Sequence, residues 1–503
     1  MSDTEELTIP APGEEPQARA GRPWTRQEVA TCVAIFAAAL AVRAVYLHES
    51  SANPTFYSLT LDSRDYYLRA VGLAQNGVID TNFFWQPTFY PFWLGVLFKL
   101  TGPSILVAKI LQIVLGAITC VLTYRLGCRI FDRRIGLLAG AIVAFYGPLI
   151  FYEGEIDTAG WAAFWSVALL ILLLQTAAKG SGAWCVVLGI CGGLGILTRP
   201  TFLPVMLTAL IWLAAVFIRD RRTWTETIGR LARVMVGLLL VLAPAASECY
   251  RAAGHFGVLP TSGGLNVYLG NNEDTCKTLT IRPGFEWEEL TLLPERHGCK
   301  TRQEASQFFY GKAWQYAKAE PFSFASGLGH KALQMANGRE IPRNVDIYLF
   351  REWSRLLGLL VWKAGRFGFP WGVLFPLAVW GLVWGWRRIP LPLVLFVVLY
   401  LLGIVVVFVA DRYRVPVVPA MSILAAAGCM SIIDMLRGRQ WRALATACCV
   451  AAAVGIISNL SKPACEEKVN YASEMYALLA QNAEEAGQTG QARELNEKAL
   501  ELD

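Results

Sequence analysis

Charged residues are scarce in this chain of 503 residues: Asp, Glu, Lys and Arg make up 17% of it, against 55% hydrophobic residues. A soluble protein of this size carries about a quarter charged residues. The mean hydropathy of +0.41 agrees with this deficit. Lipid is therefore the main solvent of the chain, which excludes an ordinary soluble globular protein.

A basic surface for nucleic acid is also lacking. The net charge is +6 and the isoelectric point is near 8.7. The basic residues cluster in short connections between apolar segments, where membrane topology explains them. We therefore expect no nucleic-acid partner.

The long apolar runs predict an all-α polytopic membrane protein with about 11 transmembrane helices, because each is long enough to cross a hydrocarbon core of roughly 30 Å. The first run is too long for a signal peptide, so residues 1–27 are expected to form a disordered cytosolic tail. The predicted spans are 28–48, 104–126, 135–152, 158–178, 184–198, 203–218, 234–250, 370–386, 390–409, 416–436 and 441–459.

The sidedness follows from the arginines, which gather in alternate short loops on the side of the N-terminus. The positive-inside rule makes that side cytoplasmic and predicts a multi-pass protein of the cell's inner (plasma) membrane. The segments expected on the outer, periplasmic side are 49–103, 153–157, the turn at 198–200, the long loop 251–369, residues 411–414 and the tail from 461.

Two outer segments have helical patterns. Residues 353–369 are amphipathic and predict an interfacial helix outside the spans. Residues 461–503 predict a small soluble helical tail that resembles a single tetratricopeptide hairpin. Because one such repeat cannot bury a core, the tail is expected to dock on the long loop or on a partner, or else to remain a solvated tail.

Metal-binding patterns are absent from the 12 cysteines, most of which fall in apolar runs. Cys276 and Cys299 both lie in the long loop and could form a disulfide if it is extracytoplasmic. The 4 histidines lie in or near outer segments, so a divalent metal shared with carboxylates stays open. No other cofactor is predicted.

Polar side chains that could do chemistry cluster in three outer segments. The first cluster is Asp62 with Asp65, in a helix expected to start near Ser63 and to stop at Asn76-Gly77. Asp62 could be an N-cap that accepts from free backbone N–H groups, or it could face a site.

The second cluster is Glu153, Glu155 and Asp157, either a solvated turn or three carboxylates kept at the membrane for function. The third is basic and includes Arg199, Arg412 and Arg414. Guanidinium groups match phosphate oxygens, although pairing with lipid headgroups or with nearby Asp411 would also explain them.

Together these clusters suggest a reaction on a lipid-linked phosphate. A carboxylate can remove the proton of an acceptor hydroxyl, and the cations can stabilise the departing phosphate as negative charge builds on it.

The order of these motifs resembles glycosyltransferase family 39 of the GT-C superfamily, which includes protein O-mannosyltransferases and aminoarabinose transferases. The resemblance covers about residues 25–440. The motifs that carry it are Leu61-Asp62-Ser63-Arg64-Asp65-Tyr66, Gln86-Pro87-Thr88-Phe89-Tyr90-Pro91, Phe151-Tyr152-Glu153-Gly154-Glu155, Leu197-Thr198-Arg199-Pro200, Tyr268-Leu269-Gly270-Asn271-Asn272 and Arg412-Tyr413-Arg414-Val415-Pro416.

The resemblance implies a GT-C fold and an inverting sugar transfer from a polyprenyl-phosphate-linked donor at the outer membrane face. Asp62 would be the catalytic base, and Glu153 or Glu155 would assist the acceptor or a metal. Arg412 and Arg414 would hold the lipid phosphate, with Arg199 as a further candidate. Other candidates for the site are Asp65, Tyr66, Gln86, Asp157 and Asn271.

One departure bears on the activity: lipid A transferases have a lysine where this chain has Gln86, which argues against that reaction. The acceptor, whether protein, lipid or glycan, stays unassigned. The alternative function is a transporter or lipid-linked sugar flippase, but internal repeats and charged spans, which a transporter would be expected to show, are not evident.

Overall fold

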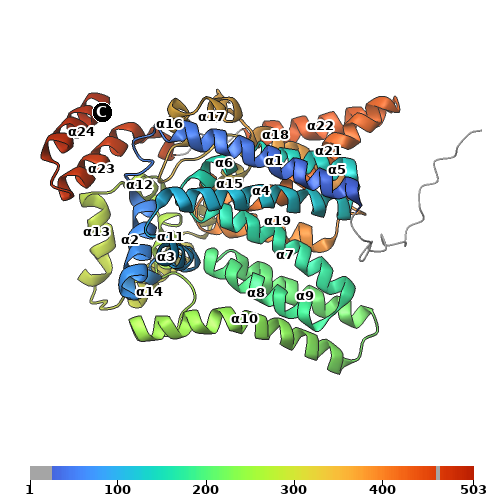
Figure 1. The fold of residues 1–503 in the computed structure, drawn as a ribbon, viewed down its shortest axis with the longest axis horizontal. Coiled ribbons are helices and arrows are strands. Elements are labelled where there is room, and N and C mark those ends of the chain that lie inside the picture. Colours follow the sequence, from blue (N-terminus) through green and yellow to red (C-terminus); the bar gives the residue numbers. More distant parts are fainter. Residues whose placement is uncertain (1–24, 460–464) are drawn as a thin grey trace, which may run out of the picture.

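The computed structural model describes residues 25–459 and 465–503. Long helices lie side by side in one bundle, and short helices gather at one end of it, together with the C-terminal helices α23 and α24 (Figure 1). We call this end the site end. The predicted tail 1–27 lies almost wholly outside the described residues.

Among the described residues, 7 helices are long and apolar enough to cross a membrane. An eighth span is added if α5 and α6, bent by 50° at a short break, count as one. The candidates are α1 (Arg26–Ser50), α4 (Ile105–Ile130), α5 (Arg133–Ala144) with α6 (Gly147–Gly154), α7 (Ala159–Lys179), α9 (Phe202–Arg219), α10 (Trp224–Ala253), the segment Asp411–Arg437 and α22 (Trp441–Ser458).

Three shorter apolar helices complete the bundle: α8 (Gly182–Thr198), α18 (Trp371–Gly385) and α19 (Leu391–Val406). Each of the 11 predicted spans thus falls on a helix or on the α5–α6 pair, which confirms the polytopic helical fold. By length, however, only 7 or 8 of the described segments suffice to cross a membrane, because α8, α18 and α19 are short for a hydrocarbon core.

Short elements at the site end connect the spans (Figure 1). They are α2 (Leu61–Asn76), η1 (Thr81–Phe84), α3 (Phe89–Thr101), α11 (Gly263–Leu269), α12 (Thr275–Thr280), α13 (Phe285–Arg296), α14 (Arg302–Ala319), α15 (Pro321–Ala336), α16 (Ile347–Phe350), η2 (Arg351–Trp353), α17 (Arg355–Leu360), β1 (Trp362–Ala364) and β2 (Phe367–Phe369).

The segment Asp411–Arg437 comprises α20 (Asp411–Arg414), η3 (Val415–Val417) and α21 (Val418–Arg437). After α22 the chain continues into η4 (Cys465–Lys468), α23 (Tyr471–Glu485) and α24 (Thr489–Leu502). The helices α23 and α24 pack against each other as a hairpin.

The prediction of one interfacial helix over 353–369 is wrong. Only the short α17 is helical there, and β1 pairs antiparallel with β2 across a turn at Gly365, whose φ is +56°. Glycine adopts this left-handed conformation without steric cost. The rings of Trp362 and Phe369, which are paired across the two strands, stack at 5.3 Å between centroids. This aromatic contact stabilises the hairpin that stands where a helix was predicted.

Glycines allow two of the helices, α8 and α10, to touch backbone to backbone. A Cβ added at Gly237 would lie 2.1 Å from the carbonyl oxygen of Val186, and one added at Gly189 would lie 2.1 Å from that of Val234. Small residues allow this close approach in membrane bundles, where the contact replaces the hydrophobic effect as a source of stability.

We expect Gly237→Ala to destabilise the protein by roughly 1–3 kcal/mol, because the new methyl group overpacks this contact. Gly229→Ala is the matched control on the same helix, since nothing lies within 4 Å of its added Cβ. It should be neutral or stabilising, because alanine favours the helix. Thermal unfolding in detergent measures both, and equal midpoints would contradict the packing described.

Candidate active site

Asp62 lies in the first turn of α2, and its side chain is 26% exposed. The N-cap of α2 is Thr60, so the prediction that Asp62 caps the helix is wrong. Its carboxylate instead accepts hydrogen bonds from three side chains: Gln86 at 2.7 Å, Arg412 at 2.6 Å, and Asn344. Three donors from separate segments thus fix this carboxylate.

Arg412 continues a line of alternating charges. Its Nη1 atom lies 3.6 Å from Asp157, whose other oxygen lies 3.7 Å from Nη2 of Arg199. Both guanidinium groups also lie over the ring of Tyr413, at 5.1 and 5.2 Å from its centroid. Residues from four predicted outer segments therefore meet here, which supports their common placement on one side.

A cavity of about 500 Å³ opens beside this line of charges. Four guanidinium groups line it, against two carboxylates, so an anion is the ligand that its charge favours. The Nε atoms of Arg199 and Arg412 are buried and have no hydrogen-bond partner in the described part of the chain. The charged lining residues are Asp62, Asp65, Arg199, Arg282, Arg343 and Arg412.

The remaining lining combines uncharged polar side chains, among them Gln86 and Asn344, with aromatic and aliphatic ones. Tyr66 and Trp85 lie near Asp62, while Tyr400, Ile404 and Val407 come from the end of α19. The cavity thus has a charged part and an apolar part, as a ligand with a charged head and a lipid chain would need.

The charge on Asp62 depends on its partners. Burial alone would raise its pKa, but the Arg412 guanidinium and the Gln86 amide together hold the pKa of Asp62 below its ordinary value. Burial raises the pKa of neighbouring Asp65, which pairs with Arg69 on the same helix. Of the two, Asp62 is the carboxylate whose partners lower its pKa.

The C-terminal helices support the rim of the cavity. Arg282, which lines it, is gripped by both carboxylate oxygens of Glu474 in α23, one of them at 2.6 Å. Its guanidinium also lies 4.9 Å from the ring of Tyr471. The predicted docking of the tail on the long loop is therefore seen in these contacts.

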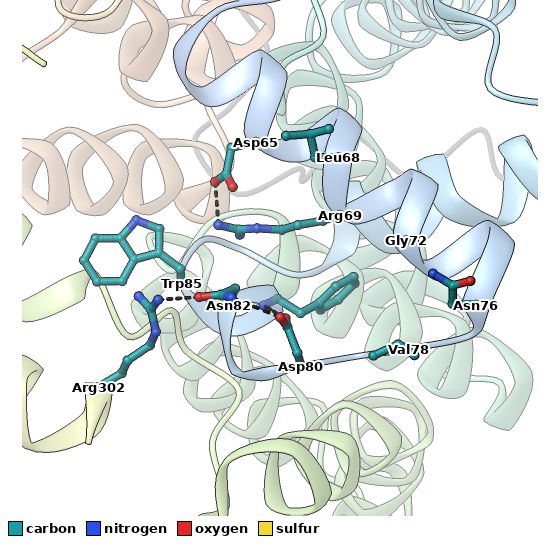
Figure 2. A pocket seen from close by; sticks show the side chains of 11 residues that line it. Asp65, Leu68, Arg69, Gly72, Asn76, Val78, Asp80, Asn82, Trp85 and Arg302 are labelled. Atoms are coloured by element: carbon teal, nitrogen blue, oxygen red, sulfur yellow. Dashed lines mark hydrogen bonds and ion pairs between the residues drawn. The ribbon is translucent and has the colours of Figure 1, made fainter. Parts of the chain in front are cut away.

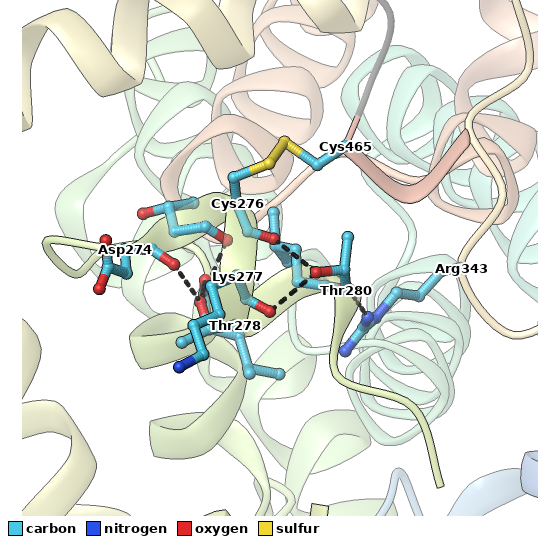
Figure 3. Close-up of a disulfide and its surroundings, with 10 residues drawn as sticks. Asp274, Cys276, Lys277, Thr278, Thr280, Arg343 and Cys465 are labelled. Carbon is cyan, nitrogen blue, oxygen red and sulfur yellow. Dashed lines mark hydrogen bonds between the residues drawn. A yellow bond between two sulfur atoms is a disulfide. The ribbon is translucent and has the colours of Figure 1, made fainter. Parts of the chain in front are cut away.

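A disulfide reinforces this contact. It joins Cys276 in α12 to Cys465 in η4, across 189 residues of sequence (Figure 3). The suggested pairing of Cys276 with Cys299 is wrong, since Cys299 is free. The sequence favoured two cysteines of one loop, but the tail folds back and brings Cys465 closer.

Five predicted site residues do not line the cavity, and one of them, Asp157, belongs to the line of charges beside it. Arg414 donates to the carbonyl oxygens of Gln334, Asn337 and Arg339, so it braces a loop. Glu153, 1% exposed, pairs with buried Arg43 at 2.6 Å.

Glu155 lies near Lys109, and burial raises its pKa. Asn271 accepts from Lys331 at 2.8 Å and donates to two backbone carbonyls. Across the described ranges, no group of three or more His, Cys, Asp and Glu side chains could hold a metal ion.

Sequence reasoning missed Asn344, Arg343, Arg282 and Glu474. The first three lie in the long loop, where no apolar periodicity or spacing places them relative to Asp62. A signal was available for Arg282 and Arg343, because both are arginines outside the arginine-rich short loops. The same reasoning had singled out Arg199 and Arg412.

Residues 86–247 match the family model described as dolichyl-phosphate-mannose-protein mannosyltransferase. A search of the curated proteins found no match. This match over residues 86–247 agrees with the resemblance to GT-C glycosyltransferases expected from the motifs. The described helices are those of a multi-pass membrane protein.

Solved structures with similar folds include the Archaeoglobus fulgidus oligosaccharyltransferase, at 16% identity and a TM-score of 0.47, covering 90% of this chain and 57% of that chain. ArnT from Cupriavidus metallidurans bound to undecaprenyl phosphate matches at 15% identity and a TM-score of 0.42, covering 95% of this chain and 74% of that one. This chain thus spans little more than half the length of the archaeal enzyme.

We expect peptide mapping without reductant to recover Cys276 linked to Cys465, with Cys299 open to alkylation. Cys465→Ser should lower the thermal midpoint, because the link closes a long loop. Cys299→Ser is the matched control and should leave the midpoint unchanged. A peptide linking Cys276 to Cys299 would contradict the structure.

Proposed function

We propose that this protein is an inverting glycosyltransferase that moves a sugar from a polyprenyl-phosphate-linked donor to an acceptor hydroxyl. The observation that carries the proposal is the Asp62–Arg412 pair at the edge of an arginine-lined cavity. The family match and the neighbouring structure bound to undecaprenyl phosphate support the same class of donor.

In this reaction the acceptor oxygen attacks the anomeric carbon while its proton passes to the carboxylate of Asp62. The bond between that carbon and the phosphate oxygen breaks, and its electron pair leaves with the phosphate. Attack from the side opposite the leaving group inverts the anomeric carbon.

Arg412 and Arg199 stabilise the charge that builds on the phosphate. Their unpartnered Nε atoms are free to donate, whereas Nη1 of Arg412 faces Asp62 and Asp157 and Nη2 of Arg199 faces Asp157. Arg282 and Arg343 extend the same positive lining, and the apolar end at α19 accommodates the start of the polyprenyl chain.

Residues expected from the motifs but located elsewhere take supporting roles. Arg414 holds the loop that carries Asn344, and thereby positions Asp62. Glu153 ties α6 to α1 through Arg43. Gln86 does line the cavity, where it orients Asp62 at the position at which lipid A transferases have a lysine.

The site end faces the outer side of the inner membrane in this proposal. The arginines of the short loops support it, since Arg134 pairs with Asp434 beside α5 and α21, away from the cavity. The donor then presents its phosphate at the outer membrane surface.

We expect Asp62→Asn to lower kcat/KM by about 10²–10⁴-fold, the usual contribution of a general base. Donor binding should persist, because Arg412 and Arg199 remain. The assay follows labelled sugar from a synthetic polyprenyl-phosphate donor into a membrane acceptor fraction, with undecaprenyl phosphate binding measured separately. Asp434→Asn is the matched control, and undiminished transfer by Asp62→Asn would refute the base assignment.

The acid limb of the rate profile tests the pair itself. A base loses activity as the pH falls through its pKa, and Arg412 holds the pKa of Asp62 below its ordinary value. We expect Arg412→Gln to move the acid limb of kcat/KM to higher pH, because burial then acts unopposed. Arg134→Gln should leave the profile in place. Coinciding limbs in Arg412→Gln and the unaltered protein would contradict this role.

A further inference from the structure

A second hollow lies between α2, η1 and the start of α14 (Figure 2). Its volume is about 650 Å³. We call it the α2 groove. Its lining residues are Asp65, Leu68, Arg69, Gly72, Asn76, Val78, Asp80, Asn82, Phe83, Trp85 and Arg302.

The α2 groove adjoins the cavity. Asp65 and Trp85 line both spaces, so the two spaces are neighbours. Asp62 lies one helical turn before Asp65 on α2. A molecule in the groove that extends past Asp65 therefore approaches the proposed base.

Unused hydrogen-bond donors face this groove. The side chain of Arg69 is only 9% exposed and pairs with Asp65 through Nη2 alone. Its Nε and Nη1 atoms are buried with no hydrogen-bond partner in the described ranges. A buried donor that forms no hydrogen bond is costly, so a ligand oxygen that accepts from these atoms would be stabilising.

The chemistry of the groove differs from that of the cavity. Two carboxylates, of Asp65 and Asp80, balance the guanidiniums of Arg69 and Arg302, so the lining has no net formal charge. Carboxylates accept from hydroxyl groups, and guanidinium and amide N–H groups donate to hydroxyl oxygens.

Trp85 adds an aromatic surface, with the guanidinium of Arg302 5.2 Å from its ring centroid. Arg302 also donates to Asn82, so one element of the long loop closes the groove at η1 (Figure 2). An apolar surface beside paired donors and acceptors suits a ring that carries many hydroxyls. A lipid acceptor would instead need a mainly apolar wall.

We propose that the α2 groove binds the acceptor, and that the acceptor is a neutral, hydroxyl-rich glycan. This proposal rests on the proposed function, because it takes Asp62 as the group that receives the acceptor proton. The exposed lip at Asn76, Asp80 and Asn82 leaves room for the rest of the glycan chain.

The test measures binding of two ligands to the full-length protein in detergent. One is undecaprenyl phosphate; the other is a panel of neutral oligosaccharides, followed by saturation-transfer NMR beside a panel of serine- and threonine-containing peptides. We expect oligosaccharides to bind, and Arg302→Ala and Asn82→Ala each to weaken that binding about tenfold. Undecaprenyl phosphate binding should not change in either variant.

Both substituted residues are exposed, so folding should survive the changes. Arg64→Ala is the matched control, because Arg64 is on α2 but lines neither space and pairs with Glu485 instead. It should leave both ligands bound as before.

Failure of every oligosaccharide to bind, while undecaprenyl phosphate still binds, would overturn the groove assignment and leave the proposed function standing. Binding of peptides in place of oligosaccharides would overturn the glycan class, and binding insensitive to both variants would overturn the location. If the unaltered protein does not bind undecaprenyl phosphate, the result would instead contradict the proposed polyprenyl-phosphate-linked donor.

Discussion

The ion pair between Asp62 and Arg412 joins segments 350 residues apart, and the rest of the site is arranged around it. Removing a carboxylate from water is costly unless donors surround it, and here Gln86, Asn344 and Arg412 supply them. The same requirement extends outward through Asp157 to Arg199. Each charge in this line is neutralised by a residue from a different helix connection, so the connections are fixed relative to one another.

Much of the fold could be predicted from the sequence, because lipid leaves few alternatives. A hydrocarbon core admits helices of a set length, and the apolar runs show where they fall. Asp62, Asp157, Arg199 and Arg412 were also recognisable, since each is a charge beside an apolar span. Because the sequence placed these charged residues on one side of the membrane, they could be expected to lie close together.

Contacts within the long loop could not be predicted in the same way. Arg412 and Arg414 are two residues apart and look equivalent in the sequence, yet one faces the cavity and the other binds carbonyl oxygens within the protein. Which faces which depends on the short helix α20. Likewise Cys276 pairs with Cys465 because the tail folds back onto the long loop. The spacing of cysteines within the loop gives no sign of this.

The disulfide between Cys276 and Cys465 has a consequence for biosynthesis. Cys465 follows α22 in the chain, so a ribosome must finish the whole bundle before the bond can form. Until then Arg282 lacks Glu474, and the rim of the cavity is incomplete. Assembly of the site is therefore among the last events in folding, and a chain that stops short of the tail can insert its helices without completing the site.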